Sequence, residues 1–111
     1  MKANYTEKPN EIEPVGNGST RFRYNITECE NGWDCDEVIV WGAIDSKKIT
    51  AACIDDQWGG GVEQKLINDY NAHRVGLMPD QEAEDRYIQF LTKRAALKQQ
   101  IDEIIQRYKA Q

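Results

Sequence analysis

The chain has 111 residues, of which 40% are hydrophobic and 30% charged, and its formal net charge is −5. This length and composition favour one soluble globular domain with its own core and argue against two domains. Because the balance is acidic and the basic residues are scattered along the chain, the sequence disfavours direct binding to nucleic acid.

The chain contains no apolar run of the length needed to span a membrane, and its first 20 residues lack the apolar segment of a secretory signal. We therefore expect no membrane partner, and a protein that is made and kept in the cytoplasm or released from it by lysis, without secretion by a signal peptide. The three cysteines are an odd number, which argues against a disulfide scaffold.

Residues 1–18 are polar, contain Pro9 and Pro14, and end in Gly16-Asn17-Gly18. Such a segment buries too little apolar surface to offset the conformational entropy lost when it is ordered. We therefore predict a flexible N-terminal tail over residues 1–18, followed by a single domain over residues 19–111.

A strand pattern begins at Arg21, after which Phe22, Tyr24 and Ile26 alternate with polar residues. A second β-rich run, EVIVW at residues 37–41, follows Asn31-Gly32, and this dipeptide is typical of tight hairpin turns. The sequence predicts a β-hairpin.

Two registers of this hairpin are open, because a slip by one residue exchanges the two faces of a strand. A two-residue turn at Asn31-Gly32 sets Tyr24 opposite Ile39. A one-residue slip instead sets Cys29 opposite Cys35, where a disulfide could form in an oxidising compartment. The tight turn is the commoner geometry and is favoured.

Three helices are predicted after the hairpin. Asp45 or Ser46 can cap the first helix, which Gly59-Gly60-Gly61 ends, and a second helix runs from Val62 to a C-terminal glycine at Gly76. After a turn at residues 77–79, the third helix opens at Asp80 and continues to residue 109. The expected fold is α+β: an N-terminal β-hairpin packed on two short helices and one long C-terminal helix over residues 80–109.

The long C-terminal helix carries an apolar stripe with alternating spacings of four and three residues. We expect its first half, from Tyr87 to Leu97, to pack inside the molecule. Its second half extends beyond the reach of the short second helix, where the stripe would form an exposed apolar patch. We predict that this half binds a second copy or another protein, through Leu97, Ile101, Ile104, Ile105 and Tyr108.

No pattern for catalysis, a cofactor or a metal emerges from the sequence. His73 follows Asp69 by four residues but has no nucleophile near it in sequence, so we interpret it as a solvated residue at a helix end. Cys29 and Cys35, in a chain with one histidine, fall short of the four ligands of a structural zinc site. Cys53 lies on an apolar helix face and is expected to be a core residue.

Most of the chain resembles small proteins from phages and prophages of gut Bacteroides-type bacteria. The segments that carry this resemblance are NGWDCDEVIVWG (31–42), KKITAACIDDQW (47–58), EQKLINDYNAHRVGL (63–77) and EAEDRYIQFLTKRAALKQQIDEI (82–104). The resemblance implies an accessory structural or assembly role, with a cytoplasmic or virion-associated location, and supplies no catalytic residues.

The sequence therefore predicts a non-enzymatic structural or assembly accessory protein that acts through its C-terminal helix and needs no cofactor. The alternative is an acidic regulatory or inhibitory protein that binds a basic, nucleic-acid-binding target, which the net charge of −5 permits.

Overall fold

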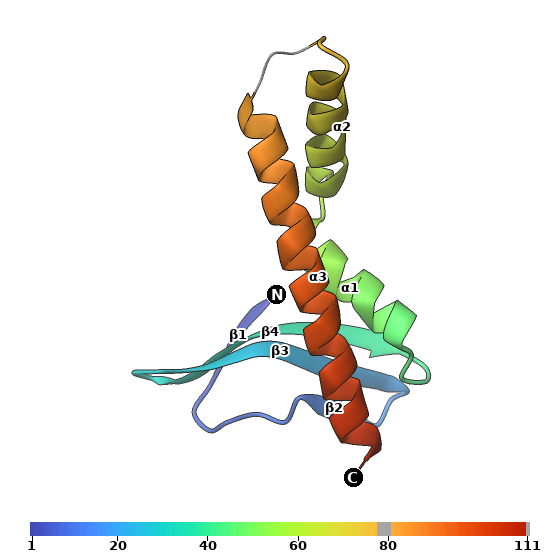
Figure 1. Cartoon of the computed structure of the whole chain (residues 1–111). Helices are drawn as coiled ribbons and strands as arrows, with labels where there is room; N and C mark the ends of the chain where they lie inside the picture. The colour runs from blue at the N-terminus through green and yellow to red at the C-terminus, as the bar shows by residue number, and fades with distance from the viewer. Residues whose placement is uncertain (78–80, 111) are drawn as a thin grey trace.

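A computed structural model describes residues 1–77 and 81–110 and shows an α+β fold (Figure 1), which confirms the predicted class. A four-stranded sheet is followed by two helices and a long C-terminal helix. The elements are β1 (Lys2–Tyr5), β2 (Ile12–Pro14), β3 (Ser19–Cys29), β4 (Gly32–Trp41), α1 (Ser46–Trp58), α2 (Val62–Arg74) and α3 (Gln81–Lys109).

The N-terminal segment is part of the sheet, so the predicted flexible tail over residues 1–18 is wrong. The strand order is β1-β4-β3-β2, with β1 antiparallel to β4 and β2 antiparallel to β3. An isolated hairpin is marginally stable and leaves unpaired backbone groups along both edges. The polar segment satisfies those edges with its own backbone, and only Ile12 needs to enter the core.

The hairpin itself is confirmed, but neither predicted register is correct. The turn lies at Glu30-Asn31, so that Cys29 pairs with Gly32. A β-bulge between Tyr24 and Thr27 then shifts the pairing by one residue. The shift places Tyr24 opposite Asp36 and puts Phe22 and Tyr24 on the same face as Val38 and Val40. Cys29 and Cys35 are not opposite each other, and in the described residues both are free thiols.

Short-range signals predicted the first two helices correctly. The side chain of Asp45 accepts a hydrogen bond from the backbone N–H of Lys47 at 2.8 Å and so caps α1, which ends before Gly59. At the end of α2, Gly76 takes a φ of 79° and its N–H donates to the carbonyl of His73. The predicted turn at Met78-Pro79 and the helix start at Asp80 lie outside the described residues.

The core lies between the sheet and the helices α1 and α3. Side chains from one face of β3 and β4 meet α1 and the second half of α3, which cross above that face in Figure 1. Cys53 is fully buried here, as predicted. The core consists of Ile12, Phe22, Tyr24, Val38, Val40, Ile49, Cys53, Leu97, Ile101, Ile104 and Ile105.

A two-helix arm projects from this body. It consists of α2 and residues 81–98 of α3, which run side by side away from the sheet (Figure 1). The molecule therefore measures 51 × 34 × 24 Å and has a radius of gyration of 16.8 Å. A compact domain of this length has a radius of gyration of about 13 Å. α3 does extend beyond the core. The half that extends is the first, whereas we expected the second half to do so.

Candidate interaction surface

The residues predicted to bind a partner lie inside the body. Leu97, Ile101, Ile104 and Ile105 are at most 7% exposed, and Tyr108 is half-buried against the same core. The expectation that they form an exposed patch is wrong, because the second half of α3 lies across the sheet. The second half of α3 does lie beyond the reach of α2, but the sheet supplies the apolar surface that buries it. Burial removes the reason for placing a partner site on these five residues.

The interior of the arm is built from aromatic rings. Trp58 and Phe90 pack edge to face with ring centroids 5.1 Å apart, and Tyr70 and Tyr87 approach to 4.4 Å. Pairs of this kind contribute about 1 kcal/mol beyond the burial of their surface. These contacts hold α2 against α3 and anchor the base of the arm to the end of α1.

The arm has few other means of burying apolar surface. Within the described chain, no side chain of α2 is fully buried. Two helices bury only the strip along which they touch, and a 13-residue helix has little stability on its own. The arm therefore exposes apolar side chains that a third element would cover in a bundle.

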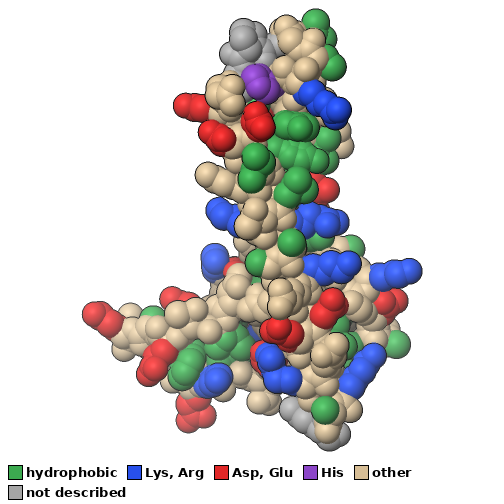
Figure 2. Space-filling view, in the orientation of Figure 1, with side chains coloured by type: hydrophobic (Ala, Val, Ile, Leu, Met, Phe, Trp, Pro, Cys, Tyr) green, Lys and Arg blue, Asp and Glu red, His purple; other side chains and the backbone are tan. Residues whose placement is uncertain are grey.

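Several of these exposed side chains share one face of α3. Ile88 is 52% exposed and Leu91 is 47% exposed, and the exposed Ala95 follows at the next helical spacing. We call these three residues the arm stripe. Val62, Val75 and Leu77 add exposed apolar surface elsewhere on the arm. Apolar side chains are visible over the arm in Figure 2, with both acidic and basic groups near its tip and basic groups near its base.

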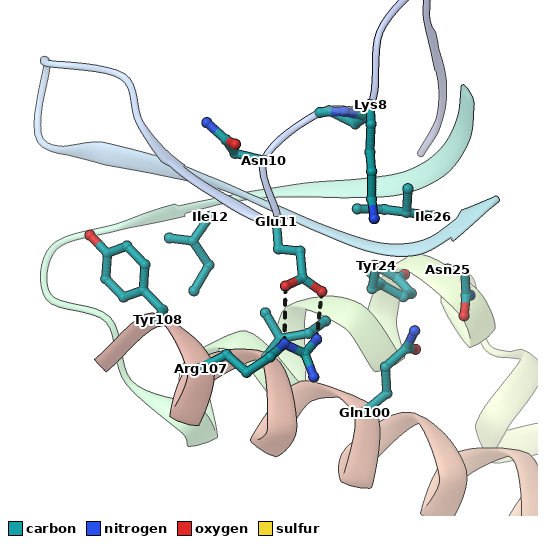
Figure 3. Close-up of a pocket in the computed structure, with 12 residues that line it drawn as sticks. Lys8, Asn10, Glu11, Ile12, Tyr24, Asn25, Ile26, Gln100, Arg107 and Tyr108 are labelled. Carbon is teal, nitrogen blue, oxygen red and sulfur yellow. Dashed lines mark hydrogen bonds and ion pairs between the residues drawn. The ribbon is translucent and has the colours of Figure 1, made fainter. Parts of the chain in front are cut away.

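A pocket of about 600 Å³ lies in the body, between the loop that joins β1 to β2, the bulge of β3 and the last turns of α3 (Figure 3). Lys8, Asn25 and Gln100 line it together with a charged pair. Arg107 donates two hydrogen bonds to the carboxylate of Glu11, at 2.7 and 3.4 Å. The pair neutralises much of the charge at the pocket and ties the N-terminal segment to α3. We therefore interpret this region as a structural contact between the two segments.

A second group of charges is buried on the sheet face away from the helices. Arg23 donates to Glu37 at 2.8 Å and to Glu13 at 2.9 Å, and its guanidinium lies 4.7 Å from the centroid of the Tyr5 ring. The Tyr5 hydroxyl also donates to Glu37. Burial would raise the pKa of Glu37, but the hydrogen bonds from Tyr5 and Arg23 outweigh it and hold that pKa below its usual value.

This charge cluster is structural, because Arg23, Glu37 and Glu13 each have a hydrogen-bonding partner within the fold. Sequence reasoning missed it, although one signal was present. Arg21 and Arg23 alternate with the apolar residues of β3, so their side chains had to share the second face of the sheet. Covering that face required the segment that we expected to be a flexible tail.

The residues considered for chemistry are not assembled into a reactive site. His73 is half-buried near the end of α2, and Asp69 pairs with Lys65 at 3.6 Å. Within residues 1–77 and 81–110, no three His, Cys, Asp or Glu side chains are grouped in a way that could hold a metal ion. Of the helices in the same ranges, none has the length and apolar character needed to cross a membrane.

Comparison of the chain with models of known protein families, with curated proteins and with solved structures finds no match. The candidate interaction site that the structure offers is the projecting arm, whose arm stripe is exposed.

Proposed function

We propose that the protein is a non-enzymatic interaction protein whose two-helix arm docks onto a second copy or another protein. The observation that supports this proposal is the exposure of Ile88 and Leu91 on a helix that stands clear of the body. An accessory structural or assembly role of this kind is also what the resemblance to phage and prophage proteins implies.

Docking through the arm makes use of both parts of the molecule. The sheet and its helices form a body with its own core, which keeps the base of α3 fixed. The arm then presents a helical face on which apolar residues recur every three or four positions, the spacing used in helix-to-helix and helix-in-groove recognition. Fully burying a leucine or isoleucine contributes about 2 kcal/mol, of which roughly half remains available at the arm stripe.

The arm explains more of this molecule than an acidic regulatory surface would. On the face shown in Figure 2, lysine and arginine side chains are interspersed with aspartate and glutamate. Recognition of a basic target favours a continuous acidic face, because steering depends on the summed field of many like charges.

The proposal is tested by placing charge on the arm stripe. We expect the Ile88→Glu, Leu91→Glu double variant to fold as the parent does, because both side chains are about half exposed. It should lose complexes that the parent forms, whether with itself in sedimentation velocity or with a protein captured from the source cells. Gln89→Glu is the matched control, since Gln89 is exposed on the same helix but off the stripe. Identical complexes for the parent and the double variant would contradict the proposal.

A further inference from the structure

We infer that the arm stripe binds a second copy of the same chain, with the two α3 helices packed antiparallel along residues 81–98. This inference rests on the proposed function and names its partner. It would give a two-fold symmetric dimer in which the same surface of both copies is used.

The spacing of residues along α3 supports this inference. Exposed or half-exposed residues recur along this part of α3 at alternating intervals of three and four, which places them on one face. We call this set the α3 seam: Gln81, Glu84, Ile88, Leu91, Ala95 and Lys98. The buried residues Ala83, Phe90 and Leu97 lie on a different side, towards α2 and the body. The α3 seam therefore lies off the face of α3 that carries these buried residues.

The distribution of charge also supports this inference. Near the tip of the arm the α3 seam carries Glu84, with Glu82 and Asp85 beside it and Arg86 as the basic residue of the same turns, whereas near the base of the arm it carries Lys98, with Arg94 beside it. Parallel packing of two arms would set like charges together, which is unfavourable. Antiparallel packing sets each acidic tip beside the basic base of the other copy, so the surface is complementary to itself.

Helical spacing and charge favour the same antiparallel register. When Ile88 of one copy lies opposite Leu91 of the other, Glu84 lies opposite Ala95 and within one turn of Lys98 across the seam. The apolar residues then occupy the centre, and two Glu84–Lys98 contacts flank them. Because residues 81–98 extend over about 27 Å, the two sheet bodies lie at opposite ends of the paired arms, which keeps them apart.

Charge reversal tests this register directly. Glu84→Lys alone and Lys98→Glu alone each place like charges at both flanks of the dimer, so we expect each to weaken dimerisation by at least about tenfold. A mixture of the two variants should restore dimerisation, because one variant then carries lysine at both flanking positions and the other carries glutamate at both. The parent should approach twice its mass of 12.8 kDa with rising concentration in light scattering. Fluorescence energy transfer from a donor label on Glu84→Lys to an acceptor label on Lys98→Glu measures the mixed dimer.

Lys93→Glu is the matched control, because it makes the same charge change at an exposed position off the α3 seam. It should dimerise about as the parent does, and mixing it with Glu84→Lys should restore nothing. A parent that stays monomeric at every concentration would overturn the inference, as would a mixture no better than the single variants. The proposed function survives a monomeric parent if Ile88→Glu, Leu91→Glu abolishes binding to a different protein, so the two failures are distinguishable.

Discussion

The carboxylate of Glu37 accepts a hydrogen bond of 2.8 Å from Nε of Arg23, on the sheet face that the N-terminal segment covers. Arg23 is only 2% exposed, and its other donors reach Glu13 and the backbone carbonyl of Asn10. A buried charge with these partners is tolerated, whereas a buried charge that loses one of them is costly. The pair therefore couples the central strands to the segment that wraps them.

Replacing the carboxylate of this pair should destabilise the fold. We expect Glu37→Gln to lower the free energy of unfolding by about 3 kcal/mol, because it leaves the buried Arg23 guanidinium without its nearest countercharge. Urea denaturation followed by circular dichroism measures the loss. Glu28→Gln, at an exposed position on the same hairpin, should change stability by less than about 0.5 kcal/mol. Equal effects of the two substitutions would show that the pair contributes nothing specific.

The same carboxylates should make stability depend on pH. Burial alone would raise the pKa of Asp36, but hydrogen bonds from Lys2 and Asn25 lower it below its ordinary value of 3.8, and the pKa of Glu37 falls below 4.5. Groups with a lowered folded pKa stabilise the fold above the unfolded pKa. That stabilisation is lost as pH falls from about 5 through the lowered values. Thermal unfolding between pH 6 and pH 3 should show the loss in the parent and a shallower slope in Glu37→Gln.

Shortening an apolar side chain should cost more stability in the second half of α3 than in the first half. Ile101 is fully buried in the body, so we expect Ile101→Ala to cost about 3 kcal/mol of unfolding free energy. Ile88→Ala removes the same atoms from a half-exposed position on the arm and should cost less than about 1 kcal/mol. Chemical denaturation at low protein concentration, where association does not contribute, compares the two. A larger loss for Ile88→Ala would contradict the placement of the body and the arm.

The three thiols should react at different rates. Burial raises the pKa of Cys53 to about 12, and it also raises the pKa of Cys35, so both thiols stay protonated near neutral pH. Cys29 is only half-buried. Iodoacetamide at pH 8 should therefore alkylate Cys29 first in the folded protein, as peptide mass mapping would reveal. The same reaction in urea is the control and should remove the difference, whereas early alkylation of Cys53 would contradict its burial.

Gly32 should be intolerant of a side chain. It has a φ of 127°, and a Cβ there would meet the backbone carbonyl of Tyr5 in the neighbouring strand β1. We expect Gly32→Ala to lower the free energy of unfolding by more than about 1 kcal/mol, through backbone strain and displacement of β1. Gly18→Ala is the control for strain alone, since Gly18 has a φ of 87° with no described atom within 4 Å of a Cβ. Equal losses would show that the close approach of Tyr5 has no effect.

Local signals in the sequence were sufficient to predict the hairpin and the first two helices. Asp45 caps α1, Gly59 follows its last residue, and Gly76 closes α2, because each effect acts within one turn of the backbone. The α+β class followed from the same evidence. The burial of Cys53 could also be predicted, since its neighbours on one helix face are apolar.

The register of the hairpin and the fate of the N-terminal segment were decided only by the tertiary structure. A β-bulge beside Asn25, which takes a φ of 53°, shifts the pairing by one residue and so puts Phe22 and Tyr24 on the same face as Val38 and Val40. Composition likewise describes what residues 1–18 can bury by themselves. Composition does not reveal that the hairpin has open edges for residues 1–18 to pair with, nor that these residues cover the buried Arg23.

The apolar stripe of α3 shows the same division most clearly. Its periodicity predicted a long helix with an apolar face, and the helix is present from Gln81 to Lys109. Which half of that face would be buried depended on where the sheet lay, and sheet position arises from pairings between segments distant in sequence. Leu97 and Ile101 are therefore core residues, while Ile88 and Leu91 remain exposed. Helix periodicity is a short-range property, whereas burial depends on the surface that the rest of the fold provides.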